Sequence, residues 1–434
     1  MALLAILLFL SIFLLILYGY PVAFTLGGIS VLYAICFLDP SSFAALPPRI
    51  MGTMSNYVLL AVPLFIYMGI MLEKSGLAET LLETMAMLFG EIKGGLAISV
   101  VIVGALLAAS TGIVGATVIT MGLISLPTML KRGYQPELAT GTIASSGTLG
   151  QIIPPSVVLV LLGSVLNVSV GDLFKAALLP GVLLVLVYIF YISIIAHLYP
   201  GTAPGIPKAE IAAFKGKGFA WRVIKAFVLP LALIVAVLGS ILMGIASPTE
   251  AAAVGAFGAT ILTILQKRLN YSRFQAVMHE TTHLSTMVFI ILLGATTFGF
   301  VFREMGGDRY LIELIETAEL PPYAFLFLVM FVVFIAGFFI DFIEIIFIIV
   351  PVVTPIFTAY DMNLIWIGIL LALNLQTSFL SPPFGFALFY LKGVAPPEVT
   401  TSHLYRGIIP FVCIQLIFLL LVLLFPDMIF LLFD

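Results

Sequence analysis

The chain has 434 residues, of which 62% are apolar and only 9% are charged, with a formal net charge of −3. A soluble domain carries about 25% charged residues, and one water-soluble core cannot bury this much apolar surface. The composition therefore excludes a soluble globular protein, a disordered chain and a nucleic-acid-binding protein. Continuous apolar runs, unlike the alternating strands of an outer-membrane barrel, predict an all-α polytopic membrane protein surrounded by a lipid bilayer.

Eight apolar runs are long enough to cross about 30 Å of hydrocarbon, which takes about 20 helical residues. They predict spans at roughly 2–20, 22–38, 57–73, 174–198, 224–245, 249–266, 284–302 and 407–425. The first run has no basic residue ahead of it and no small-residue cleavage site, so we expect a retained span and not a signal peptide.

Two longer apolar segments, 95–130 and 322–358, do not fit single spans. Small or polar residues interrupt each one midway, at Ser110-Thr111-Gly112 and from Gly337 to Asp341. Half of such a segment, about 16 residues at ~1.5 Å each, reaches only ~24 Å and does not cross the bilayer. The pattern therefore predicts two re-entrant helical hairpins.

Two further apolar segments, 136–170 and 362–391, each contain a double proline near the middle. The pairs are Pro154-Pro155 and Pro382-Pro383. Proline removes a backbone donor and clashes with the preceding helical turn. Two prolines in a row therefore predict a broken helix in each segment, not a bend.

The order of span, hairpin and broken helix occurs twice along the chain. The sequence separation between Pro127 and Pro355 equals that between Pro154 and Pro382. This equal spacing predicts an internal repeat of the kind found in transporters. The predicted division is 1–56, N-terminal scaffold helices; 57–198, first repeat; 199–283, cytoplasmic loop and central scaffold helices; 284–406, second repeat; and 407–434, C-terminal helix.

The basic residues predict the orientation in the membrane. With the N-terminus outside, 14 of the 18 Lys and Arg residues fall in cytoplasmic segments, as the positive-inside bias requires. The four outside are Arg49, Lys175, Arg303 and Arg309. With this orientation the first hairpin enters the membrane from the cytoplasm and the second from the outside, so the repeats are predicted to be inverted.

Inverted hairpins and broken helices are expected to meet near the midplane, where freed backbone carbonyls can coordinate sodium. Glycine, proline and apolar residues would contribute main-chain oxygens, while serine and threonine could add hydroxyls. The predicted sodium ligands are Ser110, Thr111, Gly112, Gly150, Ile153 and Pro155 in the first half and Gly337, Ser378, Ser381 and Phe384 in the second. The alternative is that these small residues only allow close helix packing.

Asp341 and Glu344 stand in a strongly apolar stretch. A charge at membrane depth is costly unless paired or hydrated, and therefore marks a functional site. Asp341 is predicted to contact substrate, a cation or a proton; the alternative is a structural ion pair or a hydrogen bond across the hairpin. The predicted substrate-binding residues are Asp341, Asn374, Gln376, Thr377, Thr148, Pro154 and Pro382.

One motif points to a different function, an intramembrane zinc metalloprotease. His279, Glu280 and His283 match H-E-x-x-H, which on a helix places two histidines on one face for zinc. No third-ligand motif accompanies them, so we expect a helix at the membrane interface, with no zinc at His279 and His283 and no enzymatic activity. Because the chain has no nucleotide-binding motif, we expect the energy to come from an ion gradient or from another subunit, with no cofactor other than sodium as the coupling ion.

Several runs resemble the large membrane subunit of tripartite ATP-independent periplasmic (TRAP) transporters. They are Ser110–Thr117, Leu126–Tyr134, Gly147–Ser156, Gly337–Asp341 and Asn374–Gly385. The resemblance covers essentially the whole chain. It implies a sodium-driven, elevator-type secondary transporter of the bacterial inner membrane. It also implies two partners, a small four-helix membrane subunit and a periplasmic substrate-binding protein.

The same resemblance implies that the substrate is a small carboxylate, either a C4-dicarboxylate or a 2-keto or 2-hydroxy acid. The main alternative is a standalone sodium–carboxylate symporter of similar architecture. The two differ in whether transport needs a binding protein and a stable four-helix partner.

Overall fold

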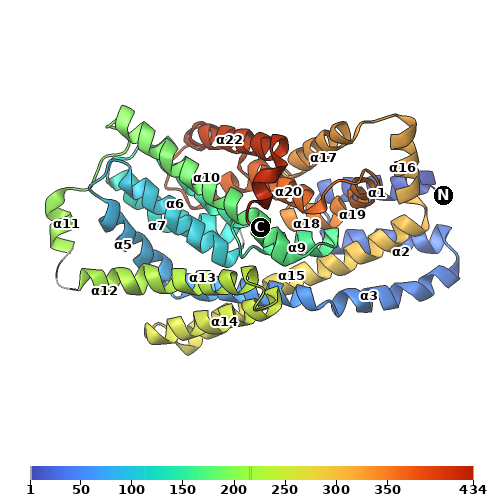
Figure 1. Cartoon of the computed structure of the whole chain (residues 1–434), viewed down its shortest axis with the longest axis horizontal. Helices are drawn as coiled ribbons and strands as arrows, with labels where there is room; N and C mark the ends of the chain where they lie inside the picture. Colours follow the sequence, from blue (N-terminus) through green and yellow to red (C-terminus); the bar gives the residue numbers. More distant parts are fainter. Residues whose placement is uncertain (1, 113, 215, 217, 434) are drawn as a thin grey trace.

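The computed structural model describes residues 2–112, 114–214, 216 and 218–433, and within these residues all regular structure is helical (Figure 1). Seven of the described helical segments are long and apolar enough to span a membrane, and an eighth qualifies if the bent pair α18 and α19 is one span. The seven are Tyr57–Lys74, Val114–Lys131, Val170–Leu198, Phe219–Leu242, Pro248–Leu265, Tyr271–Glu304 and Thr401–Leu424. The prediction of an all-α polytopic membrane protein is confirmed.

The helices of the first half are α1 (Ala2–Leu17), α2 (Val22–Phe37), η1 (Pro40–Ala45), α3 (Leu46–Met54), η2 (Tyr57–Leu60), α4 (Ala61–Lys74), α5 (Leu77–Phe89), α6 (Gly95–Thr111), α7 (Val114–Lys131), α8 (Pro136–Thr148), η3 (Leu149–Gln151), α9 (Val157–Leu166) and α10 (Val170–Leu198). Those of the second half are α11 (Lys208–Phe214), α12 (Phe219–Val223), η4 (Ile224–Val228), α13 (Leu229–Leu242), α14 (Pro248–Leu265), α15 (Tyr271–Glu304), α16 (Gly307–Thr317), α17 (Pro322–Ala336), α18 (Phe342–Ile348), α19 (Val350–Ala359), α20 (Leu364–Leu380), α21 (Phe386–Val394), α22 (Thr401–Leu424) and η5 (Pro426–Phe430).

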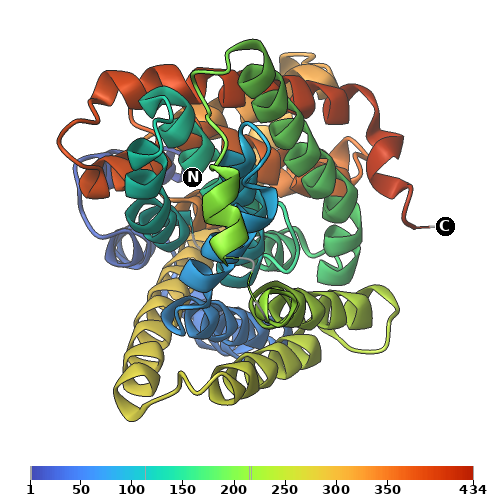
Figure 2. The same cartoon turned by 90° about the vertical axis from the view of Figure 1, so that its left-hand side faces the viewer.

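Two helix pairs join the halves of the chain. α2 packs along α15 and α14 packs along α4, so each half contributes a helix to the other. Gly27 and Gly294 let α2 and α15 approach closely, and a Cβ on Gly294 would lie 2.6 Å from the carbonyl oxygen of Ala23. Between α4 and α14, the hydroxyls of Tyr67 and Thr260 are 2.8 Å apart. Figure 2 shows α4 between α14 and α15, with the red α22 at the opposite edge.

The first predicted hairpin segment turns back on itself. α6 and α7 lie side by side (Figure 1), and the two ends of the segment meet where the backbone N–H of Leu96 donates to the Tyr134 hydroxyl at 3.3 Å. α6 ends at Gly112, which has φ +62° and donates its N–H to the carbonyl oxygen of Ala108. A left-handed residue at the end of a helix favours glycine because other residues clash there.

The second predicted hairpin segment also brings its ends together. The rings of Phe325 and Phe357 are 5.2 Å apart, and the Tyr360 hydroxyl donates to the Leu320 carbonyl oxygen at 2.7 Å. The returning arm consists of two helices, because α18 and α19 meet at a bend of 49°. Pro351 lies in the first turn of α19, where its missing N–H and bulky ring prevent α18 from continuing.

Both double prolines interrupt helices. The chain leaves helical geometry between η3 and α9 and again between α20 and α21, and in both places the bond between the two prolines is cis.

The prediction for 284–302 was too short, since α15 begins at Tyr271 and includes the H-E-x-x-H motif. The order of elements is the same in both halves; that the second half is an inverted copy of the first stays a prediction.

The hairpins and the broken helices of the two halves pack against each other. α9 packs on α18 and α19 of the second hairpin, while α21 packs on α7 of the first. Gly115 and Gly122 of α7 make room for α21, with the ring of Tyr390 3.0 Å from a Cβ built on Gly115. The four segments that contain the chain breaks therefore form one packed unit.

Candidate functional site

The tip of the first hairpin touches the first broken helix through backbone. A Cβ on Gly112 would lie 3.0 Å from the backbone nitrogen of Val157, and a Cβ on Gly150 would overlap the carbonyl of Ala108. Ile153 lies beside Gly181 of α10. The structure thus places Gly112 and Gly150 at one interface, with the Pro154-Pro155 break next to it.

Two of the predicted sodium ligands at this tip, Ser110 and Thr111, are described by their backbone alone. The backbone of Ser110 and Thr111 forms the last turn of α6, while their side chains lie outside the described part of the structure. Pro155, in the break itself, is buried.

In the second half, Gly337 at the hairpin tip lies directly against the hydroxyl of Ser378. The Ser378 hydroxyl donates to the Leu375 carbonyl oxygen at 2.9 Å, and the Ser381 hydroxyl donates to that of Thr377 at 2.9 Å. Each hydroxyl oxygen has two lone pairs, so donating the proton to a carbonyl leaves the oxygen able to bind a cation.

The second break is more open than the first. Phe384 is 57% exposed and packs its ring 5.3 Å from that of Phe339, while Pro382 is half-buried. In the first break Pro154 is buried. The structure therefore gives the two breaks different accessibility.

Asp341 begins α18 at the tip of the second hairpin. Its carboxylate accepts a hydrogen bond from the backbone N–H of Phe342 at 2.7 Å. It lies close enough to Glu344 and Tyr390 to interact electrostatically with both. Of the two salt bridges formed by described residues, neither involves Asp341. The alternative of a structural ion pair thus finds no basic partner for Asp341 in the described part of the chain.

Three of the predicted substrate residues hydrogen-bond within the protein. Asn374 donates from Nδ2 to the Met330 carbonyl oxygen at 2.7 Å and so ties α20 to α17. The Thr377 hydroxyl donates to the carbonyl of residue 373 and the Thr148 hydroxyl to that of residue 145. These contacts give Asn374, Thr377 and Thr148 a structural role, and their contact with substrate stays a prediction.

Gln151 and Gln376 are both fully buried, and neither amide atom of either side chain has a hydrogen-bond partner within the protein. Leaving a buried polar group unpaired costs about 1–3 kcal/mol. η3, which contains Gln151, packs against α20, which contains Gln376. The two amides are therefore candidates for binding a ligand between the broken helices.

Gln376 was predicted from the sequence, whereas Gln151 was missed. The signal that could have found it is its position three residues before the double proline Pro154-Pro155, next to the predicted break.

The H-E-x-x-H motif lies within α15 and is used in packing. The Glu280 carboxylate forms a salt bridge of 3.0 Å with Lys74 at the end of α4. Among the described residues there is no group of three or more His, Cys, Asp or Glu side chains that could hold a metal ion. The motif therefore joins two long helices at this point.

Comparison with known proteins gives a family match over nearly the whole chain. Residues 9–428 match the family described as the DctM component of tripartite ATP-independent periplasmic transporters. The chain belongs to this family. It is 32% identical over 402 residues to the C4-dicarboxylate TRAP transporter large permease protein DctM of Pseudomonas aeruginosa, covering 92% of this chain and 91% of that protein. It is 30% identical over 413 residues to the sialic acid TRAP transporter large permease protein SiaM of Vibrio cholerae, covering 94% and 93%.

A solved structure supports the fold of this DctM-family chain. The YdaH transporter of Alcanivorax borkumensis superposes with a TM-score of 0.63 over 90% of each chain at 13% sequence identity. At this identity the likeness concerns the fold alone.

The family assignment confirms the resemblance seen in the sequence. DctM-family chains are transporter permeases and not enzymes, so this chain is a multi-pass inner-membrane protein of that class. The large permeases of tripartite transporters work with a small membrane subunit and a periplasmic binding protein.

Proposed function

We propose that this chain is the large subunit of a sodium-driven uptake system for a small organic acid, supplied by a periplasmic binding protein. The observation that carries the proposal is the direct contact of each hairpin tip with a broken helix, Gly112 with Val157 and Gly337 with Ser378. Broken helices inside a membrane protein are tolerated where they line a binding cavity, and their free carbonyls suit sodium.

The proposed sodium ligands follow from these contacts. In the second half the hydroxyls of Ser378 and Ser381 supply oxygens, and the main chain of Gly337 and Phe384 completes the set. In the first half the set is Ser110, Thr111, Gly112, Gly150, Ile153 and Pro155.

A small carboxylate is the proposed substrate, either a C4-dicarboxylate or a 2-keto or 2-hydroxy acid. Relatives of this chain are named for C4-dicarboxylates and for sialic acid, both of which are acids. The unpaired amides of Gln151 and Gln376 can donate to a carboxylate, which supports their place beside it. The Asp341 carboxylate would repel an anion, so it is assigned to the coupling cation or to a proton.

The proposed movement is of the elevator type. The hairpins and broken helices pack together as one unit, which supports their moving as one body, while the pairs α2 with α15 and α4 with α14 support a fixed scaffold. Substrate and sodium would then cross the membrane bound to the moving body.

Uptake by proteoliposomes tests the proposal. The chain and its small subunit are reconstituted, and labelled succinate or 2-oxobutanoate is offered with and without an inward sodium gradient and a binding protein. Uptake that requires both the gradient and the binding protein is expected. Equal uptake without a sodium gradient would contradict sodium coupling, and full uptake without any binding protein would favour a standalone sodium–carboxylate symporter.

A further inference from the structure

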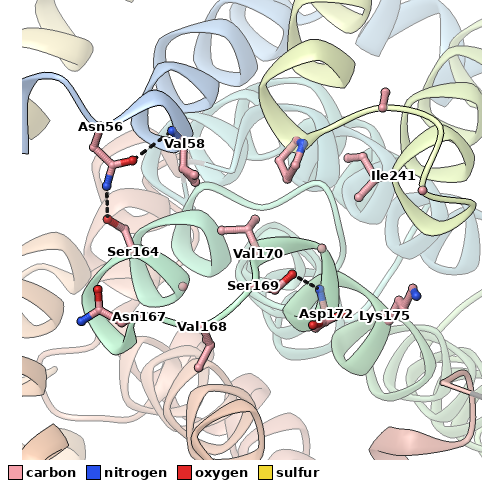
Figure 3. A pocket seen from close by; sticks show the side chains of 15 residues that line it. Asn56, Val58, Ser164, Asn167, Val168, Ser169, Val170, Asp172, Lys175 and Ile241 are labelled. Carbon is pink, nitrogen blue, oxygen red and sulfur yellow. Dashed lines mark hydrogen bonds between the residues drawn. The ribbon is translucent and has the colours of Figure 1, made fainter.

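Two adjoining cavities lie on the side that the charge distribution assigns to the outside. The first, of about 550 Å³, is formed by the α9–α10 connection, the start of α10 and the α13–α14 connection (Figure 3). The second, of about 340 Å³, lies between α3, α9, α15 and the second hairpin. They share Asn56, Ser164 and Asn167, and the Asn56 amide donates to the Ser164 hydroxyl at 3.4 Å.

Three of the four basic residues on the outside line these cavities. Arg49 and Arg303 line the second cavity and Lys175 lines the first, while Arg309 lines neither. Basic residues are disfavoured outside the membrane by the insertion bias. Their gathering around one pair of cavities therefore needs another reason, and a negatively charged ligand provides it.

Neither Arg49 nor Arg303 pairs with a carboxylate of the described residues. Arg49 lies 5.3 Å from the centre of the Phe300 ring, and Arg303 donates from Nε to the Gly299 carbonyl oxygen at 3.0 Å. Both contacts leave guanidinium donors unused. No Asp or Glu lines the second cavity among the described residues, whereas Asp172 lines the first.

Small polar side chains complete the second cavity. The hydroxyls of Thr53 and Thr296 lie 3.2 Å apart on α3 and α15, and Asn167 at the end of α9 also lines the cavity. A volume of about 340 Å³ falls in the range of sites for small molecules, roughly 300–1,000 Å³. The combination of guanidinium, hydroxyl and amide groups is suited to carboxylate oxygens.

We propose that the second cavity is a capture site for the substrate carboxylate, held by Arg49 and Arg303 before the substrate reaches the hairpin tips. The assignment rests on the proposed function, because it takes the substrate to be an organic acid. Lys175 in the first cavity adds to the positive field that attracts the anion. Arg49 and Arg303 belong to the proposed scaffold, whereas Phe347 and Pro351 belong to the second hairpin, so the site lies between the fixed and moving parts.

Equilibrium binding to the purified complex of the chain and its small subunit, without binding protein, tests this site. Labelled succinate and 2-oxobutanoate are the probes. Arg49→Ala and Arg303→Ala are each expected to raise Kd about 10-fold, and Arg49→Lys is expected to raise it less because the charge remains. Arg309→Ala is the matched control, since Arg309 is an exposed arginine outside the cavities, and its Kd is expected to equal that of the wild type.

The same arginines could instead dock the binding protein, and a second measurement separates the two roles. The affinity of the binding protein for the complex is expected to be the same in the wild type and in Arg49→Ala. A loss of that affinity in Arg49→Ala with unchanged succinate binding would overturn the capture site. Succinate Kd values equal to that of the wild type in both Arg49→Ala and Arg303→Ala would also overturn it, as would an equal rise of the succinate Kd in Arg309→Ala. If the wild type takes up no carboxylate under a sodium gradient, the proposed function itself is wrong.

Discussion

Gly337 lies against the hydroxyl of Ser378 with no space for a Cβ between them. Gly337 closes α17 at the tip of the second hairpin, and Ser378 lies in the last turn of α20. The contact fixes the distance between two segments that supply the proposed sodium ligands. Because Gly337 has an ordinary helical conformation with φ −65°, its small size and not its backbone freedom is what this position requires.

The first prediction concerns that contact. Gly337→Ala should push the hairpin tip away from α20 and raise the sodium concentration for half-maximal uptake about 10-fold, equivalent to about 1.4 kcal/mol. Gly239→Ala is the control, since Gly239 lies inside α13 and a Cβ there would meet no atom within 4 Å. Sodium-dependent uptake in proteoliposomes measures both, and an unchanged sodium dependence in Gly337→Ala would remove this interface from the sodium site.

The second prediction concerns the hydroxyls. Ser378→Ala and Ser381→Ala should each raise the sodium concentration for half-maximal uptake, because each removes one oxygen from the proposed ligand set. Ser240→Ala is the matched control, since its hydroxyl also donates to a carbonyl one turn earlier, that of Val237 at 2.7 Å, but it lies in α13. If sodium dependence is unchanged in both variants, only main-chain oxygens bind the ion.

The third prediction isolates the charge of Asp341. Asparagine can accept the same hydrogen bond from the N–H of Phe342, so Asp341→Asn should leave folding and membrane insertion intact while lowering the uptake rate at least about 10-fold. Asp361→Asn is the control, because Asp361 is exposed and its φ of 54° is one that asparagine also adopts. Normal uptake by Asp341→Asn would exclude a role for this carboxylate in transport.

The sequence predicts the parts of this fold whose signals are local. Single prolines such as Pro127 and Pro180 lie inside helices, but two prolines in a row, or a glycine next to small polar residues, favour a helix end. The breaks after Gly112 and at Pro154 were therefore predictable without any tertiary information. The bend before Pro351 has the same cause. The first part of α15, from Tyr271 to His283, carries many polar side chains and lies outside the predicted span, because the span was located by hydropathy although the helix continues through it.

Features that depend on packing between distant segments were not predictable. Arg49 and Arg303 lie in opposite halves of the chain and meet at one cavity only because α3 and α15 pack together. Gln151 looks like one polar residue in an apolar run, and that both its amide atoms lack a partner is a property of the folded chain. Asn374 likewise has its partner, Met330, on another helix.

The last prediction concerns a contact on the side that the charge distribution assigns to the cytoplasm. Arg132, just after α7, forms two hydrogen bonds with the Glu210 carboxylate on α11, at 2.6 and 3.2 Å. These bonds hold the pKa of Glu210 below its ordinary value of 4.5. A lowered pKa in the folded state means that the contact stabilises the fold above about pH 4.5 and is lost as the pH falls through the lowered pKa.

Glu210→Gln should therefore lower the unfolding temperature of the purified protein at neutral pH. The unfolding temperature of the variant should also fall less than that of the wild type as the pH is lowered, so that the two proteins have the same unfolding temperature at the lowest pH. Glu313→Gln, at an exposed glutamate on α16 that forms neither of the two salt bridges of the described residues, is the control and should keep the wild-type decline. High salt should reduce the difference between wild type and Glu210→Gln, because the pair is exposed and screened. A difference that persists unchanged down to the lowest pH would show that Glu210 acts through packing and not through its charge.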